Sequence, residues 1–104
     1  MPTRVYRITD LQVTVAHTNP PGLKIHVEFE APTSGWRGFV LQHFVYPVPP
    51  VDGVYEADMV GEPPCGPSND VITPLVYDEV LTPFPHNLEG LTVHSVSNSV
   101  TARI

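Results

Sequence analysis

The side chains that could carry catalysis or bind a metal are one cysteine, five histidines and eleven acids. Cys65 lies in the segment 63–67 (PPCGP), a rigid turn that should expose its sulfur. A nucleophilic thiolate needs a neighbouring cation or histidine, but the nearest charges along the chain are the acids Glu62 and Asp70. We therefore expect a loop cysteine, and the sequence predicts no catalytic residue.

The histidines occur singly, whereas zinc ligands usually occur in close pairs such as His-x-x-x-His. They are His17, His26, His43, His86 and His94. His43 and His94 fall at expected strand centres and could meet across a sheet, whereas His26 lies on a polar strand face between Lys24 and Glu28. We predict no metal and no cofactor, with a histidine site as the alternative.

Glu56 and Asp58 are two residues apart, so both should project from one face of a strand, about 7 Å apart. Further acids that could join them as calcium ligands are Asp52, Asp70, Asp78 and Glu79. The sequence has no Asp-x-Asp-x-Asp-Gly loop and no local nucleotide-binding or hydrolase motif. These acids are therefore interpreted as solvated surface groups, and a Ser-His-Asp triad assembled in space is left open.

The composition indicates that strands must position these side chains. The chain has 104 residues with sixteen valines, four isoleucines and nine threonines against four alanines, and β-branched residues favour strands. Thirteen prolines exclude helix interiors and mark loops. This length suits one domain, residues 1–104, with its own core.

Alternation of apolar and polar residues predicts strands at 11–17, 23–30 and 54–60. Their expected inward residues are Leu11, Val13, Val15, Leu23, Ile25, Val27, Phe29, Tyr55, Ala57 and Met59. Residues 38–46 are apolar on both faces, which predicts a central strand. An edge strand interrupted at Pro74 is expected over 71–81, and two last strands over 91–96 and 100–104.

Seven or eight short strands separated by proline and glycine turns predict an all-β, antiparallel two-sheet sandwich of immunoglobulin-like type. A small β-barrel is the alternative. Trp36, at the entry to the expected central strand, resembles the strand-C tryptophan of immunoglobulin domains, but the paired cysteines of those domains are absent.

The net charge of −6 lies entirely in residues 53–104, where Arg103 stands against seven acids. Five basic residues in the whole chain argue against nucleic acids and anionic membranes as partners. No apolar run approaches the roughly 20 residues of a membrane-spanning helix, and the N-terminus lacks the apolar region of a signal peptide. A cytoplasmic location is expected, with a removed signal peptide as the alternative.

Rigid loops with aromatic and arginine anchors are typical of binding surfaces, because they lose little entropy on docking. Trp36, Arg37, Phe84 and His86 adjoin proline-rich turns and are the predicted binding residues. A core position is the alternative for Trp36. Phe84, between two prolines, is the better surface candidate.

The segment 32–36 (PTSGW) resembles the Asn-Pro-Thr-Thr-Gly-aromatic loop of the chagasin-type cysteine-protease inhibitors. That family consists of immunoglobulin-like β-domains of about this size. The resemblance covers five residues; Ala31 stands where the family has asparagine, and the family's glycine-rich second loop and Arg-Pro-Trp third loop are absent. It implies a protease-inhibitor-like domain.

The sequence therefore predicts a soluble, acidic, non-enzymatic binding or accessory domain that recognises a protein partner through proline-rich loops. The alternatives are a small metal-dependent or cysteine/histidine enzyme built on His43, His94, Cys65 and the Glu56/Asp58 pair, and the inhibitor-like domain. A homo-oligomer formed through edge strands is a third interpretation.

Overall fold

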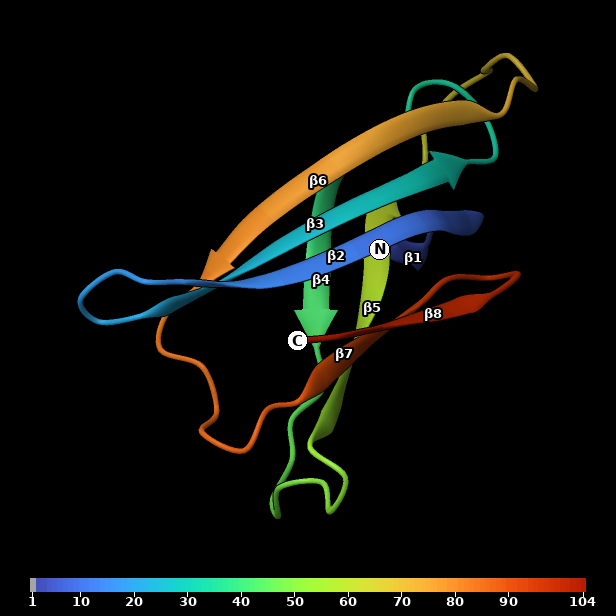
Figure 1. Cartoon of the computed structure of the whole chain (residues 1–104). Helices are drawn as coiled ribbons and strands as arrows, with labels where there is room; N and C mark the ends of the chain where they lie inside the picture. Colours follow the sequence, from blue (N-terminus) through green and yellow to red (C-terminus); the bar gives the residue numbers. More distant parts are fainter. Residues whose placement is uncertain (1) are drawn as a thin grey trace.

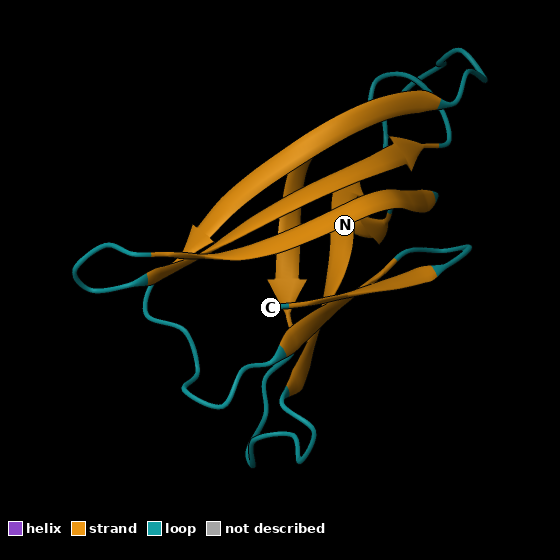
Figure 2. Ribbon diagram, in the orientation of Figure 1, coloured by secondary structure: helices purple, strands orange, loops and turns teal. Residues whose placement is uncertain are grey.

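The computed structural model describes residues 2–104, which form two β-sheets and no helix (Figure 1, Figure 2). The strands are β1 (Thr3–Arg4), β2 (Arg7–Ala16), β3 (Gly22–Ala31), β4 (Arg37–His43), β5 (Val54–Glu62), β6 (Thr73–Leu81), β7 (Gly90–His94) and β8 (Ser99–Arg103). Among the described residues, no helix is long and apolar enough to cross a membrane. The all-β prediction is confirmed, and β1 is the one strand it did not include.

The three-stranded sheet has the order β2-β3-β6 and is antiparallel throughout. In β3 the residues alternate between the two faces, so that Leu23, Ile25, Val27 and Phe29 are buried while Lys24 is exposed. β6 pairs only with β3 in the described chain, which confirms the predicted edge strand. The predicted interruption at Pro74 is wrong: Pro74 is the second residue of the unbroken strand β6 and is paired with Glu30, at the end of an edge strand where a missing N–H is tolerated.

The five-stranded sheet is built around β5. Asp58 is paired with both Gln42 of β4 and His94 of β7, so β4 lies on one edge of β5 and β7 on the other. β1 pairs with β5 beyond the end of β7, and β8 follows β7. The predicted central position of the strand at 38–46 is therefore wrong: β4 is an edge strand.

The structure differs from the sequence-based prediction in two further respects: one strand pair is parallel, and the outward apolar residues of β4 do not face another layer. β5 and β7 are parallel, so the sandwich is not antiparallel throughout, because the chain crosses to the other sheet as β6 before it returns. The outward apolar residues of β4 cover single neighbours rather than another layer: Val40 is paired with Val60, and Phe44, just after the strand, stacks on His94.

The core lies between the two sheets, with β4 and β5 passing behind β2, β3 and β6 at a steep crossing (Figure 1). Phe29 of β3 meets Phe39 of β4 edge-to-face, with ring centroids 5.0 Å apart. Gly61 of β5 permits this contact, since a Cβ atom there would come within 2.6 Å of the Phe39 ring. A sandwich-like arrangement fits these observations.

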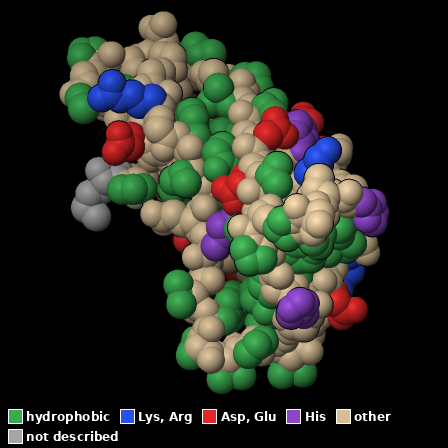
Figure 3. Space-filling model, turned by 90° about the vertical axis from the view of Figure 1, so that its left-hand side faces the viewer, with side chains coloured by type: hydrophobic (Ala, Val, Ile, Leu, Met, Phe, Trp, Pro, Cys, Tyr) green, Lys and Arg blue, Asp and Glu red, His purple; other side chains and the backbone are tan. Residues whose placement is uncertain are grey.

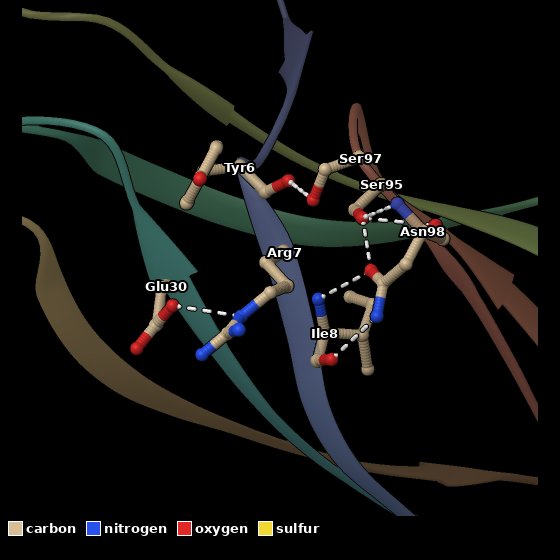
Figure 4. A network of polar contacts seen from close by, with 7 residues as sticks. All are labelled: Tyr6, Arg7, Ile8, Glu30, Ser95, Ser97 and Asn98. Atoms are coloured by element: carbon tan, nitrogen blue, oxygen red, sulfur yellow. Dashed lines mark hydrogen bonds and ion pairs between the residues drawn. The ribbon is translucent and has the colours of Figure 1, made fainter.

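One pair of sheet edges is joined by side chains, and we call it the stitched seam (Figure 4). Asn98, in the β7–β8 turn, accepts a hydrogen bond from Ile8 N through Oδ1 and donates one to Ile8 O through Nδ2, both at 2.9 Å. Ser97 Oγ donates to Tyr6 O at 2.7 Å. The Asn98 amide thus takes the place of a neighbouring strand for Ile8.

The opposite pair of edges, between β4 and β6, has no strand pairing in the described chain, and we call it the open seam. The barrel alternative is therefore wrong, because a barrel requires an unbroken ladder of strands. His43 Nε2 lies 2.7 Å from Glu79 Oε2 across this seam. Glu79 points inward from the edge strand, a feature that discourages edge-to-edge pairing.

Candidate functional site

The β6–β7 loop, residues 82–89, brings two predicted binding residues together. Phe84 and His86 share a small apolar pocket of about 210 Å³. Its lining residues are Pro20, Pro21, Pro83, Phe84 and His86. Phe84 is half-buried and also packs against the core, whereas His86 is exposed. The structure therefore gives Phe84 a pocket-lining side and a core-facing side.

Trp36 and Arg37 lie at the other end of the molecule, where β3 leads into β4 (Figure 1). Trp36 is half-buried and its Nε1 donates a hydrogen bond to Thr33 Oγ1 at 3.1 Å, within the segment 32–36. Arg37 is exposed and is paired with Glu62 of β5. The four predicted binding residues thus belong to two separate surfaces.

Residues 44–53, between β4 and β5, form a loop that the sequence analysis did not single out; we call it the valine loop. The side chains of Val45, Val48 and Val51 are 93%, 73% and 106% exposed. Figure 3 shows hydrophobic side chains at the lower end of the molecule, where Figure 1 places this loop. The signal was present in the sequence, in which valines alternate with Pro47 and the pair at 49–50.

The valine loop is held by hydrogen bonds. Gly53 N donates to Pro50 O at 3.1 Å, and Val54 N donates to Asp52 Oδ1 at 3.0 Å. Asn87 of the β6–β7 loop donates from Nδ2 to Pro50 O at 3.3 Å and accepts from Tyr55 Oη at 2.7 Å. The two proline-rich loops are therefore connected and form one continuous surface.

On the outer face of the five-stranded sheet, a serine, a histidine and a glutamate are joined by two hydrogen bonds, with the histidine between the other two. Ser99 Oγ lies 2.6 Å from His94 Nδ1, and His94 Nε2 lies 2.7 Å from Glu56 Oε1. The predicted common face of Glu56 and Asp58 fits this arrangement, since Asp58 is paired with His94 on the same face. A carboxylate, an imidazole and a hydroxyl in this order are the components of nucleophilic catalysis by serine.

Aromatic residues cover this constellation from the side of β4. The Phe44 ring stacks on the His94 ring, with centroids 5.8 Å apart and an interplanar angle of 20°. Tyr46 Oη lies 3.4 Å from Glu56 Oε2. Burial raises the pKa of Tyr46, and the negative charge of Glu56 raises it further, so the phenol stays protonated as a donor.

His26 occupies the outer face of the three-stranded sheet. Its Nδ1 lies 2.6 Å from Asp78 Oδ1 and its Nε2 lies 3.1 Å from Glu28 Oε2. The hydrogen bond with Asp78, followed by the one with Glu28, raises the pKa of His26. The two carboxylates engage opposite sides of the imidazole, so these three side chains do not converge on one metal position.

The remaining sequence candidates are dispersed. His43 points between the sheets toward Glu79 while His94 lies on the outer face, so the two histidines do not meet as the sequence suggested. Cys65 is exposed in the β5–β6 loop. Among residues 2–104, no group of three or more histidine, cysteine or acidic side chains could hold a metal ion.

Comparison with known proteins found no matching family model, no matching curated protein and no matching solved structure.

Proposed function

We propose that the chain is a binding or accessory domain that recognises a protein partner through its proline-rich loops, chiefly the valine loop. The observation that carries this proposal is the exposure of Val45, Val48 and Val51, at 73–106%, within seven residues of a loop that also holds three prolines. Single exposed valines are ordinary on a protein surface. Three on one restrained loop form a patch that a partner can cover.

The energetics favour docking at this loop. Burying a valine side chain stabilises by about 1.5–3 kcal/mol, so covering all three contributes about 5–9 kcal/mol before the cost of association. Prolines and the hydrogen bonds of Gly53 and Asn87 already restrict the loop. A restricted loop loses less conformational entropy on binding, so more of that gain remains as affinity.

Charge indicates which kind of partner fits. Asp52 is the charged residue of the valine loop, and the second half of the chain carries the whole net charge of −6. Phosphate-rich partners such as nucleic acids and anionic membranes are therefore disfavoured. An apolar protein patch with basic residues at its rim is the complementary surface. The pocket at Phe84 and His86 belongs to the β6–β7 loop, which Asn87 connects to the valine loop, and could add to the contact.

The immunoglobulin-like type of the sandwich remains a prediction supported by its two-sheet arrangement, and the proposed function does not depend on it. A cytoplasmic location and self-association through edge strands also remain predictions, and the proposed function depends on neither. The latter has its own test: a molecular mass in solution that rises with protein concentration would support pairing through β6, whose outer edge carries no partner strand in the described chain.

A pair of matched double variants tests the proposal. Val48→Ser/Val51→Ser alters the valine loop, whereas Val76→Ser/Val80→Ser alters two valines of β6 that are 58% and 62% exposed. Proteins cross-linked to the wild type in lysate of its own source are identified, and the best-enriched one is purified. We expect the loop variant, and not the β6 variant, to raise the Kd for this partner at least about tenfold, which is 1.4 kcal/mol.

Circular dichroism and thermal unfolding establish that both variants are folded. Equal Kd values for the wild type and the loop variant would refute the valine loop as the binding surface. A loss confined to the β6 variant would transfer recognition to the sheet edge. Absence of any partner enriched over an unrelated acidic β-protein would refute the binding proposal itself.

A further inference from the structure

We propose a second site on the outer face of the five-stranded sheet, where Ser99 is a nucleophile for small activated acyl esters, His94 is its base and Glu56 positions the histidine. The proposal rests on two consecutive hydrogen bonds: Ser99 Oγ lies 2.6 Å from His94 Nδ1, and His94 Nε2 lies 2.7 Å from Glu56 Oε1. Both distances are within the range for a nucleophile and its base.

The two contacts select one state of the neutral imidazole. Glu56 is acceptor-only when ionised, so Nε2 must carry the hydrogen. Nδ1 then presents its lone pair and accepts the hydrogen of the Ser99 hydroxyl. The acid therefore fixes the tautomer in which the histidine can take a proton from serine, which is the role of the acid in serine hydrolases.

Strand pairing sets this arrangement. His94 and Ser99 are directly paired across the antiparallel β7–β8 hairpin. Glu56 is supplied by the parallel neighbour β5, one step diagonally from His94. Sites on strands hold their geometry better than sites on loops. The Phe44 ring stacked on His94 limits rotation of the imidazole, so both of its hydrogen bonds are retained.

The expected reaction is acyl transfer with a balanced course. The Ser99 oxygen attacks the ester carbonyl while His94 Nδ1 takes the hydroxyl proton, and a bond forms between the serine oxygen and the acyl carbon. The bond from that carbon to the leaving alcohol breaks, and the alcohol leaves with its electron pair and takes the proton from His94. Water then attacks the acyl carbon while His94 takes its proton, the bond from that carbon to the Ser99 oxygen breaks, and the acid is released as His94 returns the proton to the serine oxygen.

The surroundings define the substrate class. Ser99 is exposed, which suits a small substrate approaching from solvent. The charged and titratable groups around His94 are Glu56 and Asp58 from β5, Tyr46 after β4, and Arg4, whose Nη2 pairs with Asp58 Oδ1 at 2.9 Å. Because acids outnumber bases here, uncharged esters are favoured over anionic ones.

The test uses p-nitrophenyl acetate with the full chain. We expect acetylation of Ser99, located by peptide mass spectrometry, and release of nitrophenol that falls at least about tenfold in Ser99→Ala and in His94→Gln. Ser68→Ala is the matched control, since Ser68 is an exposed loop serine. Acetyl groups found only on Lys24 or the N-terminus, or equal rates in Ser99→Ala and the wild type, would overturn the proposal.

Glu56 requires a readout that distinguishes positioning from folding. Glu56→Gln keeps the size of the side chain but can turn an amide NH2 toward Nε2, so the rate should fall and the hydrogen of the neutral His94 ring should leave Nε2 in ¹⁵N NMR spectra. A lower rate with an unchanged tautomer would exclude the positioning role. Acetylation of Ser99 is measured without a protein partner and the Kd of the partner is measured without an ester, so failure of this site and failure of the proposed binding surface are distinguishable.

Discussion

Replacing Asn98 by alanine should destabilise the protein more than replacing its neighbour Ser97 in the β7–β8 turn. The alanine variant loses the two hydrogen bonds at 2.9 Å to the backbone of Ile8, a residue that is 2% exposed, and the 2.6 Å bond from Ser95 Oγ (Figure 4). A buried polar group left without a partner costs about 1–3 kcal/mol. Because these groups are partly buried, we take the lower end for each and expect a loss of about 2–3 kcal/mol.

Urea unfolding followed by the fluorescence of Trp36 measures this loss, and the midpoint of thermal unfolding should fall by about 10–20 °C. Asn98→Asp keeps an acceptor for Ile8 N but has no donor for Ile8 O, so its stability should lie between those of the wild type and Asn98→Ala. Ser97→Ala, which removes one exposed hydrogen bond to Tyr6 O, is the control and should cost less than about 1 kcal/mol. An alanine variant at position 98 within about 0.5 kcal/mol of the wild type would refute the reasoning.

Two further predictions concern packing and protonation. Gly61→Ala should lower the free energy of unfolding by about 1–3 kcal/mol, because its Cβ would meet the Phe39 ring; Gly66→Ala, with open space around it, is the control, and equal stabilities would contradict the packing argument. The pKa of His26 is higher in the folded than in the unfolded protein, so protonation of His26 stabilises the fold. This contribution is fully present at pH values below the unfolded pKa of 6.5 and is lost as the pH rises through the higher folded pKa. Asp78→Asn should lower the His26 pKa in an NMR titration, and an unchanged pKa would show that the hydrogen bond is not its main cause.

Strands with one solvent-exposed face were predictable from sequence, because the alternation of apolar and polar residues is a local property of the chain. The buried and exposed residues of β3 follow the predicted pattern from Leu23 to Phe29. The position of β4 was not predictable in the same way. Its outward Val40 covers Val60 of the neighbouring strand, and a residue's apolar side chain does not reveal whether it meets a second sheet or one side chain.

The candidate sites depend on pairings between distant segments, so sequence patterns located only their parts. The spacing of Glu56 and Asp58 correctly placed both on one face, but their meeting with His94 needs the parallel pairing of β5 and β7. That pairing follows from a crossover through the other sheet, which no local pattern encodes. Ser99 lies outside the predicted strands at 91–96 and 100–104, and its contact with His94 depends on the pairing of β7 with β8.

The contrast between the two seams implies that the sandwich breathes from one side. At the stitched seam, backbone groups of Ile8 in β2 and of Tyr6 just before it are hydrogen-bonded to the β7–β8 turn. At the open seam, side chains of β6 contact β4 without strand pairing: Glu79 contacts His43, and Tyr77 contacts the backbone of Leu41. Local openings of lowest free energy therefore begin where β6 lifts from the core, so its amides exchange with solvent hydrogen sooner than those of β3.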